Sequence, residues 1–126
     1  MIKGIGTDLL KIDRIEKSLV RTPKLANRIL TPTELDEFSK STQPARFLAK
    51  RFAAKEALVK ALGTGIGNGV GWQHVEVIKD PLGKPMLILT GGALERAEQM
   101  GVDNYFISYS DEREYVVAMV VLEGEK

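Results

Sequence analysis

The sequence predicts an α+β fold in which mostly antiparallel strands pack around one long central helix. The helix is expected at residues 44–62, which are rich in Ala and Leu, contain no internal Gly or Pro and precede Gly63, a residue suited to a helix end. Apolar residues lie on nearly every side of this helix, as is typical of a helix at the centre of a domain. The strands are expected from short apolar runs that turn residues separate.

The first forty residues are expected to form one strand and three helices. Residues 2–10 have the pattern of a strand in which Gly4 and Gly6 leave room for another group to approach the backbone. The apolar residues that follow repeat with helical spacing until Thr22-Pro23 interrupts them. The expected helices are one that starts after residue 10, a short one that ends at Ile29, and one that runs from a capping box at Thr31-Pro32-Thr33-Glu34 to near Lys40.

The second half of the chain begins with a glycine-rich loop, because five glycines alternate with other residues at positions 63–71. Strand and turn signals then alternate along the remaining sequence. The expected elements are strands at 72–79 and 86–90 around a turn at 80–85, a helix at 93–100, and a final hairpin of strands at 105–110 and 115–122.

Length and composition indicate one cytosolic globular domain that covers residues 1–126. The chain has no cysteine, which excludes disulfide and thiolate chemistry, and it shows neither a secretion signal nor an apolar run of the ~20 residues that span a bilayer. We therefore expect a cytoplasmic protein with no membrane partner. Residues 1–60 carry thirteen Lys or Arg against seven Asp or Glu, although the net charge is only +1. This excess predicts a basic face for an anionic partner; ordinary solvated charges would give the same count.

Two acidic residues and one lysine are the first candidates for chemistry. Asp8 follows Gly4 and Gly6 at the end of the first expected strand. A carboxylate there is well placed to hold Mg²⁺ or, alternatively, to cap the next helix. Glu56 and Lys60 are four residues apart on the long helix and therefore point the same way. One interpretation is an ordinary surface ion pair. The other is a cation site, because Ala49 and Phe52 share the face of Glu56 and a carboxylate beside apolar groups needs a compensating charge.

A second set of candidates offers groups suited to phosphate. Arg46 and Arg51 carry forked donors, and Phe47 beside them is either a core residue or a cover for a nucleotide base. We expect Lys55 to be a surface or phosphate-contacting residue. The loop at 63–71 differs from a P-loop and from a dinucleotide motif, so it predicts either ligand contacts through backbone N–H groups or simple flexibility.

The expected first helix carries a basic face that continues beyond its end. This face suits an acidic helix of another protein, and a plain solvated face is the alternative. We do not expect nucleic acid as a partner, because the basic stripe is short and lacks interleaved aromatic residues. The residues of the face are Lys11, Arg14, Arg21, Lys24 and Arg28.

Two segments taken together resemble the paired signature of the 4'-phosphopantetheinyl transferase superfamily. The first is Gly4-Ile5-Gly6-Thr7-Asp8, and the second is Arg51-Phe52-Ala53-Ala54-Lys55-Glu56-Ala57-Leu58-Val59-Lys60. The continuation Ala61-Leu62-Gly63-Thr64-Gly65-Ile66-Gly67 and the chain length resemble the small carrier-protein synthase branch of that superfamily. The resemblance covers essentially the whole chain.

The resemblance implies the fold of this superfamily and a Mg²⁺-dependent transfer of the phosphopantetheine arm of coenzyme A to a serine of an acyl carrier protein, in support of fatty acid biosynthesis. It implies Asp8 and Glu56 as Mg²⁺ ligands and Lys60 as a catalytic residue that neutralises phosphate charge. The general base stays open between Glu56 acting through a water, Lys60 and a metal-bound hydroxide. By position, the implied coenzyme A site consists of Arg46, Phe47, Arg51, Gly63, Thr64, Gly65, Ile66 and Gly67, and the implied carrier-docking set consists of Arg14, Arg21, Lys24 and Arg28.

The resemblance further implies that identical subunits form the active site between them, in a homotrimer. One segment departs from the family pattern, because Asp111 stands where many relatives have a histidine, and no role is implied for it. The only histidine, His74, lies on an expected strand and is expected to be structural. Two alternatives remain: a non-catalytic module that binds coenzyme A or a nucleotide, and a nucleic-acid-binding module that uses the basic half of the chain.

Overall fold

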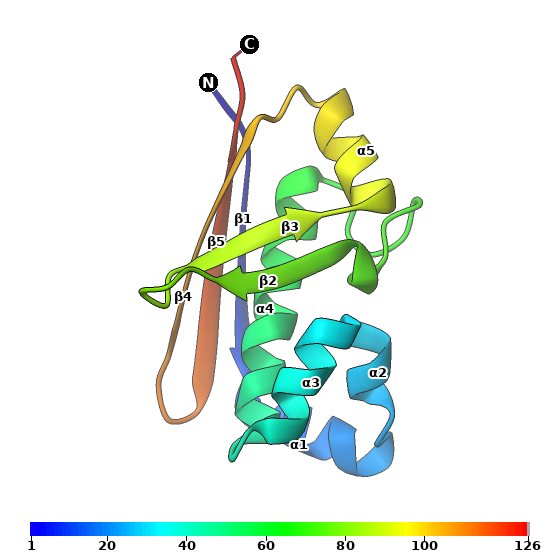
Figure 1. Cartoon of the computed structure of the whole chain (residues 1–126), viewed down its shortest axis with the longest axis vertical. Coiled ribbons are helices and arrows are strands. Elements are labelled where there is room, and N and C mark those ends of the chain that lie inside the picture. The colour runs from blue at the N-terminus through cyan, green and yellow to red at the C-terminus, as the bar shows by residue number, and fades with distance from the viewer. Residues whose placement is uncertain (126) are drawn as a thin grey trace.

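The structure is a computed structural model that describes residues 1–125, and it confirms the predicted α+β class and the long helix (Figure 1). The strands are β1 (Ile2–Lys11), β2 (Val75–Lys79), β3 (Pro85–Leu89), β4 (Asn104–Asp111) and β5 (Tyr115–Glu123). The helices are α1 (Ile12–Arg21), α2 (Leu25–Ile29), α3 (Pro32–Lys40), α4 (Pro44–Leu62) and α5 (Gly91–Gln99), together with a 3-10 turn at Trp72–His74.

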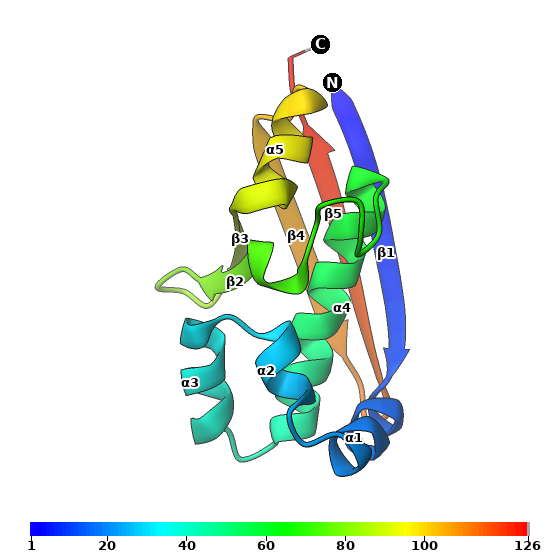
Figure 2. The same cartoon turned by 90° about the vertical axis from the view of Figure 1, so that its right-hand side faces the viewer.

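The strands form a three-stranded antiparallel sheet in the order β1-β5-β4 and a separate antiparallel ribbon of β2 and β3. The first strand pairs with the last, with Gly6 opposite Val120, so the described ends of the chain lie at the same end of the sheet (Figure 1). Figure 2 shows α4 along this sheet, with α1, α2 and α3 around its N-terminal half and α5 beside its C-terminal end. One helix therefore connects all parts of the fold.

Helix α4 approaches β1 very closely, because two residues of β1 have no side chain. A Cβ atom on Gly6 would lie 2.0 Å from the carbonyl oxygen of Ala57, and one on Gly4 would lie 2.2 Å from the carbonyl oxygen of Ala61. The prediction that these glycines admit a neighbouring group is confirmed, and the neighbour is the backbone of α4. This contact places Asp8, two residues after Gly6, against the C-terminal half of the helix.

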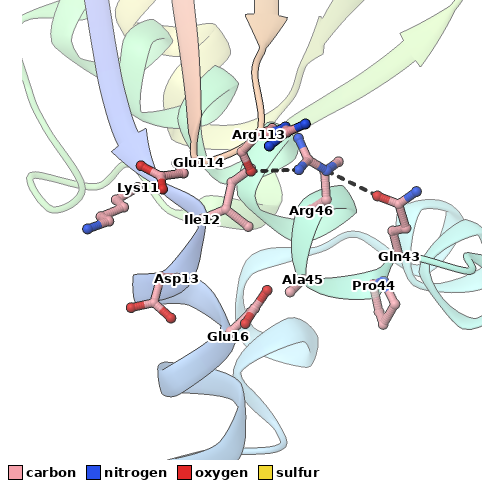
Figure 3. Close-up of a pocket in the computed structure, with 10 residues that line it drawn as sticks. All are labelled: Lys11, Ile12, Asp13, Glu16, Gln43, Pro44, Ala45, Arg46, Arg113 and Glu114. Atoms are coloured by element: carbon pink, nitrogen blue, oxygen red, sulfur yellow. Dashed lines mark hydrogen bonds between the residues drawn. The ribbon is translucent and has the colours of Figure 1, made fainter.

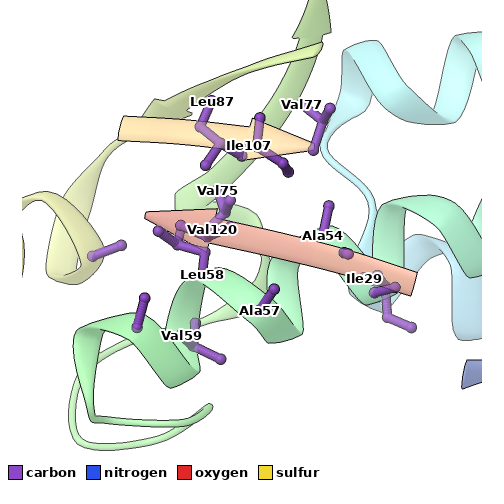
Figure 4. Packing of buried hydrophobic residues seen from close by; sticks show 14 of the residues in the cluster. Ile29, Ala54, Ala57, Leu58, Val59, Val75, Val77, Leu87, Ile107 and Val120 are labelled. Carbon is purple, nitrogen blue, oxygen red and sulfur yellow. The ribbon is translucent and has the colours of Figure 1, made fainter. Parts of the chain in front are cut away.

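The hydrophobic core lies between α4, the inner face of the three-stranded sheet and the β2–β3 ribbon (Figure 4). Ala54, Ala57 and Leu58 of α4 are fully buried, as are Val120 of β5 and Val77 of β2. Burial on most sides explains why the helix sequence shows no wide polar stripe. A helix packed in this way is a rigid support for the few polar side chains at its open edge. Within residues 1–125, none of the helices combines the length and the apolar character that crossing a membrane requires.

One predicted strand boundary is wrong. The strand expected at 72–79 begins only at Val75, because residues 72–74 form a 3-10 turn in which the His74 N–H donates to the carbonyl oxygen of Gly71 (3.1 Å). The His74 ring closes the same turn, since its Nδ1 accepts a hydrogen bond from the Gly71 N–H (3.0 Å). The histidine therefore has the structural role that was predicted for it.

Candidate active site

Asp8, Glu56 and Lys60 converge where β1 meets the C-terminal half of α4. The Lys60 ammonium donates to Asp8 Oδ1 and to the carbonyl oxygen of Thr7, each at 3.0 Å. The Asp8 side chain is only 14% exposed, whereas that of Lys60 is 51% exposed. Glu56 is half-buried one helical turn before Lys60, close enough to Asp8 for the two carboxylates to repel each other. The glycine contact between β1 and α4 thus unites residues that lie 52 positions apart in the sequence.

The electrostatics of this group leave its negative charge incompletely compensated. Burial, and then the charge of Asp8, raise the pKa of the Glu56 carboxyl above its ordinary value, and Lys60 opposes this only in part. The second carboxylate oxygen of Asp8, Oδ2, is buried and has no hydrogen-bond partner within residues 1–125. An unpartnered buried oxygen of this kind is costly unless a ligand binds it. Two carboxylates at one opening are a donor set that suits a hard divalent cation such as Mg²⁺.

The glycine-rich loop begins directly after α4 and therefore lies next to this group. Gly63 ends the helix in the left-handed conformation, and Gly65 and Gly67 also have positive φ angles, of 62° and 123°. A Cβ atom at Gly65 or Gly67 would meet no atom within 4 Å. These glycines are therefore required by the backbone conformation of the loop and not by packing within the chain. Thr64 is half-buried and Ile66 is exposed, so the first part of the loop presents both backbone and side chains at the surface.

Arg46, Phe47 and Arg51 meet at the opposite end of α4, around a shallow cavity of about 250 Å³. The Arg51 guanidinium lies 4.6 Å from the centroid of the Phe47 ring, and its side chain is only 2% exposed. Because an α-helix rises about 1.5 Å per residue, Arg46 lies about 15 Å along the axis from Glu56. The residues predicted to bind one ligand are therefore divided into two groups, one toward each end of α4.

Arg46 is held by the turn between β4 and β5 (Figure 3). Its Nη1 donates to the Asp111 carboxylate and to the carbonyl oxygen of Glu112, each at 2.7 Å, and its Nη2 donates to the carbonyl oxygen of Arg113 at 2.8 Å. Burial alone would raise the pKa of Asp111, but the hydrogen bond from Arg46 and the charge of Lys50 hold it below its ordinary value. Asp111 thus forms an internal ion pair with two basic residues of α4.

The open cavity beside Arg46 has a volume of about 590 Å³ and lies between α1, the start of α4 and the β4–β5 turn (Figure 3). The cavity is lined by equal numbers of basic and acidic side chains, so its net charge does not favour the binding of phosphate. The basic ones are Lys11, Arg46 and Arg113, and the acidic ones are Asp13, Glu16 and Glu114.

The surface position predicted for Lys55 is wrong, because its side chain is 0% exposed. Its ammonium donates to the Glu34 carboxylate (2.6 Å) and to the carbonyl oxygens of Ile29 (2.7 Å) and Trp72 (3.2 Å). Successive residues of an α-helix are about 100° apart, so Lys55 faces away from Glu56 and into the core. Glu34 was not predicted as the partner of Lys55, since the capping box at Thr31–Glu34 already accounted for that glutamate.

The basic residues of α1 and α2 surround a further cavity, of about 300 Å³, between these helices and α4. Phe52, which lines it, lies one turn before Glu56 on the same face of α4, so the cavity is adjacent to the acidic pair. Lys24 is not among the lining residues. The apolar lining consists of Leu10, Ile15, Leu25, Ile29 and Phe52, and the basic lining consists of Arg14, Arg21 and Arg28.

The sequence profile of the 4'-phosphopantetheinyl transferase superfamily matches residues 4–120 of the chain. The chain belongs to this superfamily. A holo-[acyl-carrier-protein] synthase from Vibrio cholerae serotype O1 is 55% identical over 124 residues, which are 98% of each sequence. The crystal structure of holo-[acyl-carrier-protein] synthase from Neisseria meningitidis matches with a TM-score of 0.90 and 44% identity over 98% of this chain and 99% of that one. The Bacillus anthracis synthase, solved in complex with CoA (3',5'-ADP), matches with a TM-score of 0.83 and 40% identity over 99% of both chains.

Membership of the phosphopantetheinyl transferase superfamily explains why the two signature segments occur together. The first ends at Asp8 and the second, Arg51–Lys60, forms the middle of α4. Gly6 of the first segment lies against the backbone of Ala57 in the second, and Gly4 lies against that of Ala61 just beyond it, so the two segments pack as one unit. The residues at the open edge of this unit are the acidic pair and Lys60.

Proposed function

We propose that this chain carries out the reaction of a holo-[acyl-carrier-protein] synthase. It transfers 4'-phosphopantetheine from coenzyme A to a serine hydroxyl of an acyl carrier protein and thereby supports fatty acid biosynthesis. The observation that carries this proposal is the convergence of Asp8, Glu56 and Lys60 around a buried carboxylate oxygen without a partner among the described residues. The synthases of V. cholerae, N. meningitidis and B. anthracis, which match over nearly their whole length, support the same activity.

We assign the Mg²⁺ site to Asp8 and Glu56. Mg²⁺ is usually held by one or two carboxylates and completes its octahedron with water and substrate phosphates. Two partly buried carboxylates fit this requirement. When bound, the ion supplies charge stabilisation for a diphosphate and for the oxygen that leaves. A bound cation would relieve both the lack of a partner for Asp8 Oδ2 among residues 1–125 and the raised pKa of Glu56.

The residues of the chain then position the phosphates and accept a proton. Lys60 uses two of its three N–H donors on Asp8 and Thr7, which leaves one donor for a phosphate oxygen. The carrier serine attacks the phosphorus next to pantetheine, the serine proton passes through a water to Glu56, and the bond to adenosine 3',5'-bisphosphate breaks. Phosphoryl transfer of this kind needs positioning and charge neutralisation and no covalent enzyme intermediate.

We assign carrier docking to the basic residues of α1 and α2. Arg14, Arg21 and Arg28 line the cavity beside Phe52, so an acidic helix can pair with the arginines while an apolar side chain enters the cavity. Lys24 lies between Arg21 and Arg28 in the sequence and contributes positive charge at a greater distance from the cavity. Docking here brings a carrier serine close to Glu56, because Phe52 and Glu56 share one face of α4.

We propose that a second copy of the chain completes the coenzyme A site. Arg46 and Glu56 are about 15 Å apart along α4, so groups from both ends of the helix meet more readily across an interface than within one chain. The outer face of the three-stranded sheet offers such an interface, because its apolar side chains are exposed. A homotrimer would cover this face and place the basic end of one α4 near the acidic pair of a neighbour. The exposed side chains are Ile5, Leu9, Phe106, Val117 and Met119.

Intact-mass spectrometry of an apo-acyl carrier protein tests the transfer. After incubation with the protein, coenzyme A and Mg²⁺, the carrier gains the mass of one phosphopantetheine, and adenosine 3',5'-bisphosphate is released. Glu56→Gln abolishes the gain in a protein that still folds, whereas Glu95→Gln, on the exposed face of α5, leaves it unchanged. Absence of a mass gain with several apo-carriers would refute the proposed reaction.

A further inference from the structure

The buried ammonium of Lys55 lies at the junction of α2, α3, α4 and the 3-10 turn. Its three hydrogen bonds go to Glu34, Ile29 and Trp72, and none goes to Asp8, Glu56 or Lys60. The reaction outlined above does not use this side chain. It is nevertheless the largest of the fully buried side chains in the described structure, and it lies in a buried polar cluster with Thr31, Glu34 and Arg51.

The partner of Lys55 is held in place from several sides. One carboxylate oxygen of Glu34 accepts from the Thr31 N–H (2.9 Å), and the other accepts from the Val77 N–H of β2 (2.9 Å). The Arg51 guanidinium lies 3.9 Å from Glu34, and Glu76 accepts a hydrogen bond from the Thr31 hydroxyl. These contacts fix the position of Glu34, and Lys55 links its carboxylate to the backbone carbonyls of Ile29 and Trp72.

Both of these carbonyls belong to residues that shape the docking cavity. Ile29 ends α2 and lines the cavity with its own side chain. Trp72 packs its ring on Phe52, with centroids 5.0 Å apart and an angle of 32° between the planes. Phe52 in turn lines the cavity from α4. Lys55 thus fixes Ile29 directly and Phe52 through Trp72.

A buried ion pair is often no more stabilising than apolar residues of the same volume, so stability alone does not account for one in this position. The two carbonyls are the distinctive feature, because an apolar side chain could not hold them. We propose that Lys55 is a positioning residue for carrier recognition, which acts by holding Ile29 and Trp72 so that the cavity keeps the shape the carrier requires. This inference rests on the proposed function only in placing the carrier at the cavity.

The informative variant is the double substitution Glu34→Gln with Lys55→Met. Replacing Lys55 alone would leave a buried carboxylate without its cation, which is strongly destabilising. Gln at position 34 has a single acceptor oxygen, which serves either the Thr31 N–H of the capping box or the Val77 N–H, and Met fills the volume of the lysine stem. Trp72 is the only tryptophan in the chain, so its fluorescence reports on the surroundings of the residue whose carbonyl Lys55 holds.

Three measurements on the folded double variant test the proposal. We expect the Kd for an apo-carrier, measured by calorimetry without turnover, to rise about tenfold, whereas the KM for coenzyme A stays within about twofold. We also expect acrylamide to quench Trp72 more strongly than in the parent protein, with an unchanged far-ultraviolet circular dichroism spectrum. A folded variant with parental carrier affinity and parental quenching would overturn the proposal, as would equal losses for carrier and coenzyme A.

Chemical rescue separates the role of the ammonium from that of packing. Because the chain has no cysteine, the Lys55→Cys variant can be alkylated at one site with 2-bromoethylamine in denaturant and then refolded. The thiolate displaces bromide, and the product restores an ammonium at nearly the same distance from the backbone. Among refolded products with the parental circular dichroism spectrum, carrier affinity should recover after this treatment and not after alkylation with iodoacetamide; equal recovery with both reagents would refute the positioning role. If the parent protein binds carrier but transfers nothing, the proposed reaction fails while this comparison remains decisive.

Discussion

Replacing Gly6 with alanine tests whether the contact between β1 and α4 builds the site. The added Cβ would lie 2.0 Å from the carbonyl oxygen of Ala57 and 2.7 Å from the backbone nitrogen of Ala61. The first distance is more than ~1 Å shorter than an ordinary van der Waals contact. Both atoms belong to the backbone of a buried helix and cannot rotate away. The strand and the helix must therefore separate, and Asp8 moves with the strand away from Lys60.

The cost of this overlap lies at the upper end of the range for overpacked cores, about 3 kcal/mol. For a chain of 126 residues each kcal/mol lowers the Tm by roughly 3–5 °C, so we expect a fall of about 10–15 °C. Thermal denaturation followed by circular dichroism measures it. Gly71→Ala is the matched control, because Gly71 has a φ of −118° and a Cβ there would meet only the His74 ring at 3.8 Å. A Gly6→Ala protein that melts within about 2 °C of the parent would refute the reasoning.

Three further predictions concern the acidic pair, the docking face and the outer sheet. The folded state raises the pKa of Glu56, so the folded protein binds the proton of this carboxyl more tightly than the unfolded chain does. The stability that this proton contributes is lost as pH rises above the unfolded pKa of about 4.3 and through the higher pKa of the folded state. In metal-free buffer, Glu56→Gln should therefore show a smaller loss of stability between pH 4 and pH 7 in urea titrations; a parental pH profile would contradict the assigned environment. Arg14→Glu should raise the KM for the carrier about tenfold with little change for coenzyme A, whereas Lys17→Glu, outside the cavity, should change neither in steady-state assays. Met119→Asp on the exposed sheet face should shift the assembly toward monomer in analytical ultracentrifugation, and an unchanged sedimentation coefficient would refute the interface.

Local patterns were sufficient to predict most elements of the fold. The capping box at Thr31 forms as expected, with the Glu34 N–H on the Thr31 hydroxyl, and Gly63 ends α4 in the left-handed conformation. These features depend on neighbours in the sequence, which a single sequence contains. The common face of Glu56 and Lys60 was predictable for the same reason, since helical spacing alone determines it.

Features that depend on distant partners were not predictable in this way. Lys55 has the sequence context of an exposed lysine, and only the packing of α3 against α4 places Glu34 beside it. The contacts of Arg46 within the chain, with Asp111 and two backbone carbonyls of the β4–β5 turn, were likewise not predicted. In both cases the decisive contact crosses between elements whose relative placement no local pattern specifies.

The arrangement of α4 explains why a ten-residue signature contains so few residues at the reaction site. Of Arg51–Lys60, only Glu56 and Lys60 reach the opening near Asp8. The backbone carbonyl of Ala57 makes the close contact with Gly6, and a larger separation would move Asp8 away from Glu56 and Lys60. The remaining positions are buried or half-buried against the sheet, the ribbon and the neighbouring helices. The signature therefore encodes chiefly a helix that fits against β1 at one rotation and one distance, and the chemistry follows from that fit.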